Sequence, residues 1–471
     1  MLSRRTVWKF ACVCALLIGD SASRAMAQPP EVVPRPLPSI YLPVVPAQPF
    51  SQVMKADISA KPQVQQAIQQ LFEQRYDLSD QPSPVLMSAG RKPVQWGVRV
   101  RTFTGTDWES LANMSSEEIK EKNLFPAGFR PLPHTKHPVG GQVFPPEQIK
   151  AISELEARDL QRFDVDYDLP THLTPEYPPP LFLTTHPELG DVSQGKVLSI
   201  KNYFDLLNGI VTPVQMEGMR LLLTPFPQQQ FNQTDDRKVR EPQLGVSCLD
   251  CHTNGHTNAA FHLNPDTRPQ ADRLRLDTVS LRGLYNQQIH GSKRSLRSVE
   301  DFSEFEQRTA YFDGDHVIAA KKGVHLPDRA SQVVMMAQMQ NIIDFPPAPK
   351  LNPLGRLIPE KATPEELRGE QLFHGKAQCS VCHPAPFFLD NQMHDLHLER
   401  FYTPEVVLDH HSIPDGPIKT FTLRGIKDSP PYHHDGRLLT LDDTVEFFNL
   451  VLELKLSPQE KLDLVAFLRC L

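Results

Sequence analysis

Two short motifs in this sequence carry the residue types of a covalent haem site. Each has the form C-x-x-C-H, and together they supply Cys248, Cys251 and His252 in the first copy and Cys379, Cys382 and His383 in the second. In this pattern the two thiols add to the vinyl groups of a haem, and the histidine binds its iron from the proximal side. The sequence therefore predicts two covalently bound haem c groups with both histidines as metal ligands.

The same cysteine spacing also occurs in zinc half-sites and redox dithiols. Against these alternatives, both copies end in histidine, and no further cysteine pair completes a four-ligand zinc site. Of the other cysteines, Cys12 and Cys14 lie near the N-terminus and Cys470 stands alone. The lone thiol is either a spare group or a link between two subunits of a homodimer in an oxidising compartment.

The first residues have the pattern of an export signal. Basic residues come first, an apolar run extends from Phe10 to Gly19, and small residues precede Gln28. We therefore predict a signal peptide over residues 1–27, removed on the way to the periplasm. The apolar run is too short for a permanent anchor, so no transmembrane segment is expected in the mature protein.

Composition points to a mainly α-helical protein. The 471 residues are enough for two or three domains, and the formal net charge of -7 gives no indication of nucleic-acid binding. Prolines outnumber glycines, 45 against 23, which favours helices joined by turns and extended connections.

Residues 28–200 form a proline-rich arm followed by an accessory region. Helical spacing predicts a helix from Pro62 to Arg75 and another from Pro146 to Phe163, and a capping box at Ser115 opens a short one. The segment from Phe125 to His134 is either a binding loop or, more simply, a covering loop that packs through its aromatic side chains. We expect this whole region to be removable without loss of the haem domains.

From about Lys201 the chain repeats itself. A Thr-Pro helix start at Thr212 matches one at Thr363, and Thr278–Gly283 matches Thr420–Gly425 beyond the haem motifs. The repeat predicts a first haem domain at residues 201–345, a linker at 346–362 and a second haem domain at 363–471.

These motifs resemble the bacterial di-haem cytochrome c peroxidase and MauG superfamily. The resemblance rests on the paired C-x-x-C-H motifs, the two T-x-S/T-L-R-G segments, and the sequence from Pro431 to Gly436, P-Y-H-H-D-G. It covers residues 201–471 and implies two tandem cytochrome c-like haem domains. It also implies that one haem relays electrons while hydrogen peroxide or dioxygen is activated at the other.

The resemblance and the repeat suggest roles for further residues. His262 is favoured over His256 as the group that ligates or gates the first iron, with a hydrogen bond to a haem propionate as the alternative. Arg282 and Arg424 hold matching positions and are expected to pair with haem propionates, because a planar cationic fork suits a carboxylate. His434 is expected to form hydrogen bonds near a haem edge.

Cleavage of peroxide requires a group that moves a proton between its two oxygens. The family carries such groups after the first repeat, and Glu304 and Glu306 are the candidates here. Two positions depart from the family. His290 stands where the family has a tryptophan between the haems, and Phe448, which cannot bind iron, stands at the place of the second haem's sixth ligand. Other ligands near in sequence are His433, Met393 and His394.

We interpret the sequence as an exported di-haem oxidoreductase that reduces hydrogen peroxide with electrons from a small donor protein, a cytochrome c or a cupredoxin. One alternative is oxidation of an organic or protein substrate, as in MauG-like proteins or rubber oxygenases. A second is a non-enzymatic electron-transfer cytochrome. The resemblance also allows for one calcium ion between the domains.

Overall fold

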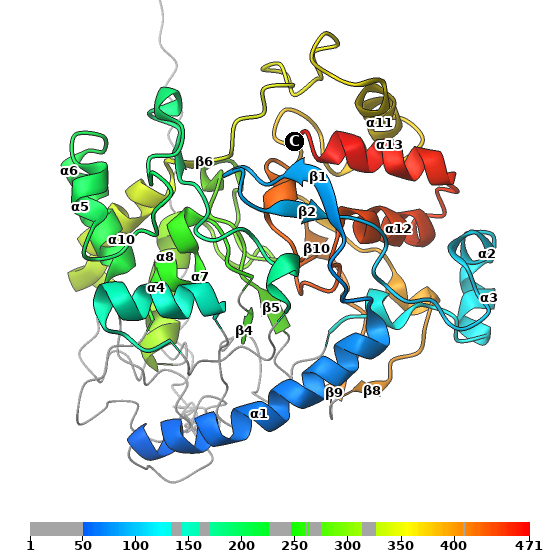
Figure 1. Cartoon of the computed structure of the whole chain (residues 1–471), viewed down its shortest axis with the longest axis horizontal. Helices are drawn as coiled ribbons and strands as arrows, with labels where there is room; N and C mark the ends of the chain where they lie inside the picture. The colour runs from blue at the N-terminus through cyan, green and yellow to red at the C-terminus, as the bar shows by residue number, and fades with distance from the viewer. Residues whose placement is uncertain are drawn as a thin grey trace, which may run out of the picture. The chain divides into compact units, whose positions relative to one another are not determined.

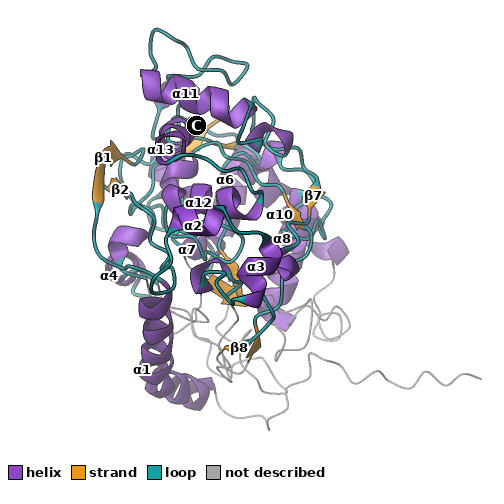
Figure 2. Ribbon diagram, turned by 90° about the vertical axis from the view of Figure 1, so that its right-hand side faces the viewer, coloured by secondary structure: helices purple, strands orange, loops and turns teal. Residues whose placement is uncertain are grey.

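The computed structural model describes residues 50–132, 144–160, 169–225, 246–259, 261–263, 275–312, 326–407 and 410–471. Helices joined by long loops make up most of this part of the chain, and the strands are short and paired two by two (Figure 2). The prediction of a mainly helical protein is confirmed at this level. In the described residues no helix is both long and apolar enough to cross a bilayer.

The helices are α1 (Phe50–Arg75), α2 (Trp108–Ala112), α3 (Ser116–Glu121), α4 (Pro146–Glu156), α5 (Tyr203–Leu207), α6 (Pro213–Leu223), α7 (Cys248–Cys251), α8 (Val299–Phe312), α10 (Leu326–Gln340), α11 (Pro364–His374), α12 (Leu441–Val451) and α13 (Pro458–Leu468). The strands pair antiparallel as β1 (Pro82–Leu86) with β2 (Pro93–Gln95), β3 (Phe182–Leu183) with β6 (Ile343–Asp344), β4 (Phe261–Leu263) with β5 (Arg275–Asp277), β7 (Met393–His394) with β10 (Ile418–Lys419), and β8 (Val406–Val407) with β9 (His410–His411).

Local capping signals fix where several helices begin. The predicted capping box at Ser115 opens α3, and the Thr212 and Thr363 boxes open α6 and α11 with proline in the first turn. A hydroxyl that accepts the N–H of the third helical residue satisfies a donor that the helix cannot. α4 is shorter than predicted, because Ala157 takes a left-handed conformation that ends the helix at Glu156.

Each repeat contains a pair of helices that cross at a glycine. α6 packs on α10, and α11 packs on α13, as the green-to-yellow and the olive-to-red pairs of Figure 1 show. A Cβ at Gly218 would lie 2.0 Å from the Met335 carbonyl oxygen, and one at Gly369 would lie 2.0 Å from that of Asp463. Only glycine allows the two backbones to approach so closely, so the repeat seen in the sequence extends to its helix packing.

The two repeats exchange equivalent backbone hydrogen bonds. The N–H of Asp277 donates to the carbonyl of His434 at 2.9 Å, and the N–H of Lys419 donates to the carbonyl of Ser292, also at 2.9 Å. Both pairs are related by the same shift of 142 positions along the sequence, the shift that relates Arg282 to Arg424. The repeats therefore meet through a contact that each one makes in the same way.

The accessory region contributes buried side chains to both repeats. Phe125 stacks on Phe401 with ring centroids 5.2 Å apart, and Phe129 meets Phe447 edge to face at 5.3 Å. A second core joins Leu181 and Leu183 to helices of the first repeat. Removal of residues 28–200 would take these side chains out of both cores, so our expectation that the haem domains tolerate it does not fit this packing.

A carboxylate also ties the accessory region to the second repeat. The side chain of Asp443, in the first turn of α12, accepts the N–H groups of Arg99 and Val100 at 2.6 and 2.9 Å, and those of Leu439 and Thr440 at 3.0 and 3.2 Å. The described part of the segment at Phe125 packs as a covering loop, whereas His134 lies outside the described residues.

Candidate functional site

The first C-x-x-C-H motif forms one helical turn followed by its histidine. The turn is α7, in which Leu249 and Asp250 are buried while the two cysteines are half-buried. His252 ends the turn, and its Nδ1 donates a hydrogen bond to the carbonyl of Val279 at 2.8 Å. This bond fixes the plane of the imidazole and assigns Nε2 as the atom that would bind iron.

The second motif repeats this arrangement in a different local structure. Cys379 to Val381 form a short 3-10 turn, and Nδ1 of His383 donates to the carbonyl of Phe388 at 2.9 Å. Burial lowers the pKa of His383, which keeps its imidazole neutral and able to ligate a metal. The motif histidines of both repeats are thus oriented by a backbone carbonyl.

These residues fit covalently bound haem. The four motif cysteines form no disulfide in the described part of the chain, and each pair stands beside an oriented histidine. The donor set of each motif is two thiols and one imidazole, which is the set that holds haem c.

A buried arginine from the accessory region holds the first motif. Arg158 reaches Asp250, the residue between Leu249 and Cys251, with two hydrogen bonds of 2.7 and 2.9 Å. Burial acts to lower the pKa of this arginine, but the hydrogen bonds and charge of Asp250 outweigh it and raise the pKa above its usual value. The side chain of Gln148 on α4 also donates to the carbonyl of Asp250. No sequence pattern singled out either partner, because each is about one hundred positions from the motif.

Arg282, expected to pair with a haem propionate, lies in a buried polar cluster between the repeats. Its guanidinium donates to Asp428 of the second repeat at 3.3 Å and to the carbonyl of Pro180 at 2.8 Å. His256 joins the cluster by donating from Nε2 to the carbonyl of Asp428 at 2.9 Å, and its Nδ1 lies 2.8 Å from the Ser280 hydroxyl. Burial first, and then the charge of Arg282, lower the pKa of His256 to about 3, so this histidine stays neutral.

Arg424 has different partners from its counterpart. Its Nε donates to the carbonyl of Leu471 at 3.0 Å, and its guanidinium lies 5.4 Å from the ring centre of Phe345. The propionate contacts expected for Arg282 and Arg424 stay predictions. The geometry shows that both arginines also tie distant segments of backbone together.

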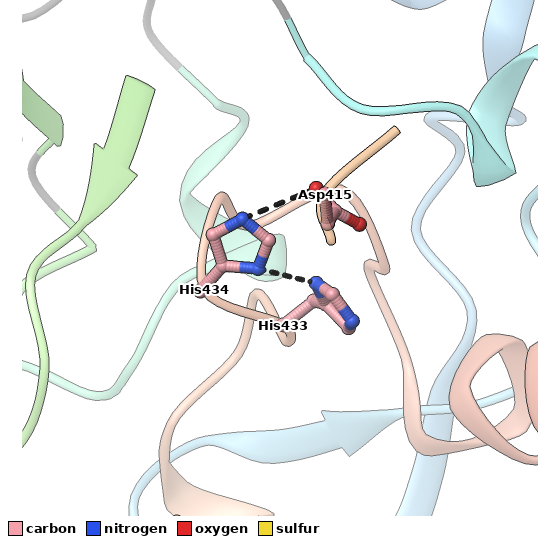
Figure 3. Close-up of side chains that lie close together, drawn as sticks. All are labelled: Asp415, His433 and His434. Atoms are coloured by element: carbon pink, nitrogen blue, oxygen red, sulfur yellow. Dashed lines mark hydrogen bonds and ion pairs between the residues drawn. The ribbon is translucent and has the colours of Figure 1, made fainter. Parts of the chain in front are cut away.

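His434 belongs to a half-buried cluster that includes His433 and Asp415 (Figure 3). The Nδ1 atoms of the two histidines lie 2.8 Å apart, and Nε2 of His434 lies 3.3 Å from a carboxylate oxygen of Asp415. Arg437 donates to both oxygens of Asp415 at 2.6 and 2.7 Å, and its Nη2 lies 3.2 Å from Nδ1 of His433. Since Arg437 donates to that nitrogen, Nδ1 of His433 is an acceptor and Nδ1 of His434 is the donor between the rings.

One guanidinium, that of Arg437, pairs with both carboxylates of this cluster, Asp415 and Asp435. Burial acts to raise the pKa of Asp415 and of Asp435, but the charge of Arg437 outweighs it and holds both below their usual values. Burial, followed by the charge of Arg437, lowers the pKa of His433 to about 3. The separations of Asp415, His433 and His434 would suit a metal ion, and the carboxylate of Asp415 also accepts hydrogen bonds from Arg437.

The structure places one of the two catalytic candidates beside the first motif. Glu304 and Glu306 are both half-buried on α8. Burial, and then the nearby charge of Glu306, raise the pKa of the Cys248 thiol to about 12, so Glu306 is the candidate close to this motif. His262 lies in β4, where its backbone pairs with Leu276 of β5, but its side chain is outside the described part of the chain.

His290 and the candidate sixth ligands occupy varied environments. His290 is buried and meets Phe302 edge to face at 6.4 Å. The helical spacing of Leu441, Val445, Phe448 and Leu452 predicts one inward face. Leu441 and Val445 are buried as predicted, but Phe448 is only partly buried and Leu452 is exposed, while Phe447 is fully buried. His394 lies 2.7 Å from Asp390, while His433 is held in the cluster described above.

Comparisons with known proteins support a haem oxidoreductase. No family model matches the chain. The methylamine utilization protein MauG of Methylorubrum extorquens is 33% identical over 123 residues, which is 22% of this chain and 33% of that protein. The cytochrome-c peroxidase IdrP2 of Denitromonas iodatirespirans is 30% identical over 148 residues, 23% of this chain and 40% of the relative. The matches thus span a third to two fifths of the relatives' length.

Two solved structures are similar over a larger part of the chain. Hydrazine synthase of Kuenenia stuttgartiensis aligns with 59% of this chain at 19% identity and a TM-score of 0.35. A MauG-like protein associated with microbial copper homeostasis aligns with 56% at 18% identity, also with a TM-score of 0.35.

Proposed function

Because the chain is a distant homologue of MauG and the di-haem cytochrome c peroxidases, we propose that it is an exported di-haem c-type cytochrome that reduces hydrogen peroxide with electrons from a small donor protein. The observation that carries the proposal is the duplicated arrangement in which His252 and His383 each donate Nδ1–H to a backbone carbonyl. Periplasmic location and two tandem cytochrome c-like domains belong to the same proposal.

The side chains of this protein have separate tasks in that reaction. A bound haem supplies an iron that takes up small oxidants where its sixth position is open and relays electrons where it is filled. His252 and His383 would hold the irons of the two haems. Glu306 accepts a proton from peroxide and returns it to the leaving oxygen, and the Arg158–Asp250 pair keeps the first motif in place.

Haem attachment is tested by mass spectrometry of the exported protein. Wild type should carry two haems that survive denaturation, because thioether bonds are covalent. Replacing Cys248 and Cys251 together by Ala should remove one, and replacing Cys379 and Cys382 should remove the other. Cys470→Ala is the matched control and should keep both. A wild-type mass without added haem would refute the proposal.

The reaction itself is tested by recording haem absorption as peroxide is added to the half-reduced protein. Peroxide consumption at the expense of a reduced cytochrome c or cupredoxin supports the peroxidase. A long-lived oxidised state with slow consumption would favour oxidation of an organic or protein substrate. A protein whose spectrum responds neither to peroxide nor to cyanide is an electron carrier only.

A further inference from the structure

A tyrosine of the first repeat is hydrogen-bonded to a carboxylate near the end of the same repeat. Tyr285 lies in the short turn that follows Gly283, and its side chain is half-buried. Its hydroxyl donates to Oδ1 of Asp344 at 3.0 Å. The same oxygen accepts the backbone N–H of Phe345 at 2.8 Å, so the carboxylate is fixed in its orientation.

The ring of Tyr285 contacts the loop that carries the second motif histidine. It meets Phe387 edge to face, with ring centroids 6.2 Å apart and planes at 87°. The next residue, Phe388, provides the carbonyl to which His383 donates. A hydrogen bond of 3.0 Å from Asn391 to the carbonyl of Asn286 holds this loop against the turn. One aromatic contact and one backbone step therefore separate Tyr285 from the residue that orients the second haem ligand.

The second repeat has no such tyrosine at the corresponding place. The shift of 142 positions that relates the repeats brings Tyr285 to Lys427, whose ammonium group donates to Ser88 and Asp428. Since the two positions are structurally equivalent, the fold does not require an aromatic side chain here. The Tyr285–Asp344 pair is therefore found in the first repeat and has no counterpart in the second.

The surroundings keep the phenol protonated. Burial, and then the charge of Asp344, raise the pKa of Tyr285 well above its usual value. A phenol in this state is oxidised readily only if its proton leaves together with the electron. The only carboxylate to which its hydroxyl is bonded in the described structure is that of Asp344.

We propose that Tyr285 is a redox-active residue that passes an electron toward the second haem and releases its proton to Asp344. The inference rests on the proposed function, because hydrogen peroxide is the oxidant. After peroxide has oxidised the haem pair, Tyr285 gives up one electron and breaks its O–H bond. The electron reduces the haem pair by one equivalent, the proton forms the carboxylic acid of Asp344, and a neutral tyrosyl radical remains. An electron from the donor protein and the return of the proton restore the phenol.

Electron paramagnetic resonance of the frozen holoprotein tests this step. Samples are mixed with hydrogen peroxide and frozen within milliseconds to seconds, and ring-deuterated tyrosine identifies a tyrosyl signal by its narrowing. Wild type should give that signal, Tyr285→Phe should lose it, and Asp344→Asn should lose or strongly diminish it because an amide cannot take the proton. Haem content measured beforehand verifies that each variant is assembled.

Tyr402→Phe is the matched control. Tyr402 is also buried, but its hydroxyl donates to a neutral group, the carbonyl of Ser412, at 3.2 Å. This variant should keep the signal. An unchanged signal in Tyr285→Phe, or a signal lost equally in Tyr402→Phe, would overturn the assignment.

The same samples separate this inference from the function on which it rests. If peroxide changes the haem absorption but no tyrosyl signal that depends on Tyr285 forms, only the inference fails. If peroxide leaves the haem absorption unchanged in wild type, the proposed function fails and the inference fails with it.

Discussion

At the scale of residues, hydrogen-bonded pairs of residues that lie far apart in the sequence position the local C-x-x-C-H motifs. The proposed haem ligands were predicted from the sequence because five consecutive residues carry the whole pattern. Arg158 and Asp415 were not, since each acts on a partner that lies well away in sequence and no local signal marks it. The partner of Arg282 was missed for the same reason, because Asp428 lies in the other repeat.

Among residues of the accessory region, replacement of Arg158 should cause one of the largest losses of unfolding free energy. Arg158→Leu leaves Asp250 buried without its cation, and the loss of one partner of a buried ion pair costs about 3–5 kcal/mol. We expect a loss of unfolding free energy of that size in denaturant titrations, with reduced haem attachment at the first motif. Arg220→Ala, at an exposed pair with Glu217, should cost no more than about 1 kcal/mol. Equal losses in the two variants would contradict this assignment.

Because His256 is buried and neutral, we expect acid to lower the free energy of unfolding. His256 has a pKa near 3 in the folded protein and about 6.5 when unfolded. Above pH 6.5 both states are neutral and stability is complete. As the pH falls from 6.5 toward 3, the unfolded state binds the proton first, so stability declines by up to about 1.4 kcal/mol per pH unit for this group.

Denaturant titrations of the holoprotein at pH 7 and pH 5 check this prediction. His256→Asn should reduce the slope of unfolding free energy against pH by up to the contribution of one histidine. This should hold even if the substitution also lowers the unfolding free energy at pH 7. The interpretation would be abandoned if the wild-type slope persisted in His256→Asn.

At the scale of elements, local signals located the helix starts but not the helix faces. The boxes at Ser115, Thr212 and Thr363 were found because capping is decided within four residues. The buried face of α12 is set by packing against Phe129 and its neighbours, which the periodicity of one helix does not contain. The end of α4 was missed because the left-handed Ala157 carries no glycine signal.

The glycine at each helix crossing should not tolerate a side chain. Gly369→Ala improves helix propensity by about 1 kcal/mol, yet its Cβ would meet the carbonyl oxygen of Asp463 at 2.0 Å. Forcing α11 away from α13 should cost about 3 kcal/mol, measured as a loss of unfolding free energy. Gln371→Ala, on the exposed side of the same helix, should change it by less than about 0.5 kcal/mol. A neutral Gly369→Ala would show that the helices do not cross so closely.

At the scale of the whole molecule, the accessory region and the two repeats share their cores. The sequence repeat indicated a boundary near Lys201, because repetition reveals which segments are alike. It does not reveal which segments are buried together, and side chains before that boundary lie in both cores. Separate repeats in the sequence therefore do not imply separate folding units.

Truncation to residues 201–471 should consequently impair assembly. We expect the truncated chain to be recovered with less haem and to lose a cooperative thermal transition. Phe129→Ala tests the same packing with a single change and should cost about 3–5 kcal/mol, whereas the partly exposed Phe103→Ala should cost far less. A truncated chain with full haem content and a sharp transition would restore the idea of a removable region.

The reciprocal hydrogen bonds between the repeats have a bearing on ancestry. Each repeat gives one backbone N–H and receives one, as the two subunits of a symmetric dimer do. A fused pair of identical haem proteins would inherit this contact without further change. Since only main-chain atoms take part, the contact is the same on both sides although equivalent side chains differ, with Asp277 opposed to Lys419 in charge and Lys427 at the place of Tyr285. The two repeats thus share a symmetric backbone frame that carries different chemistry in each half.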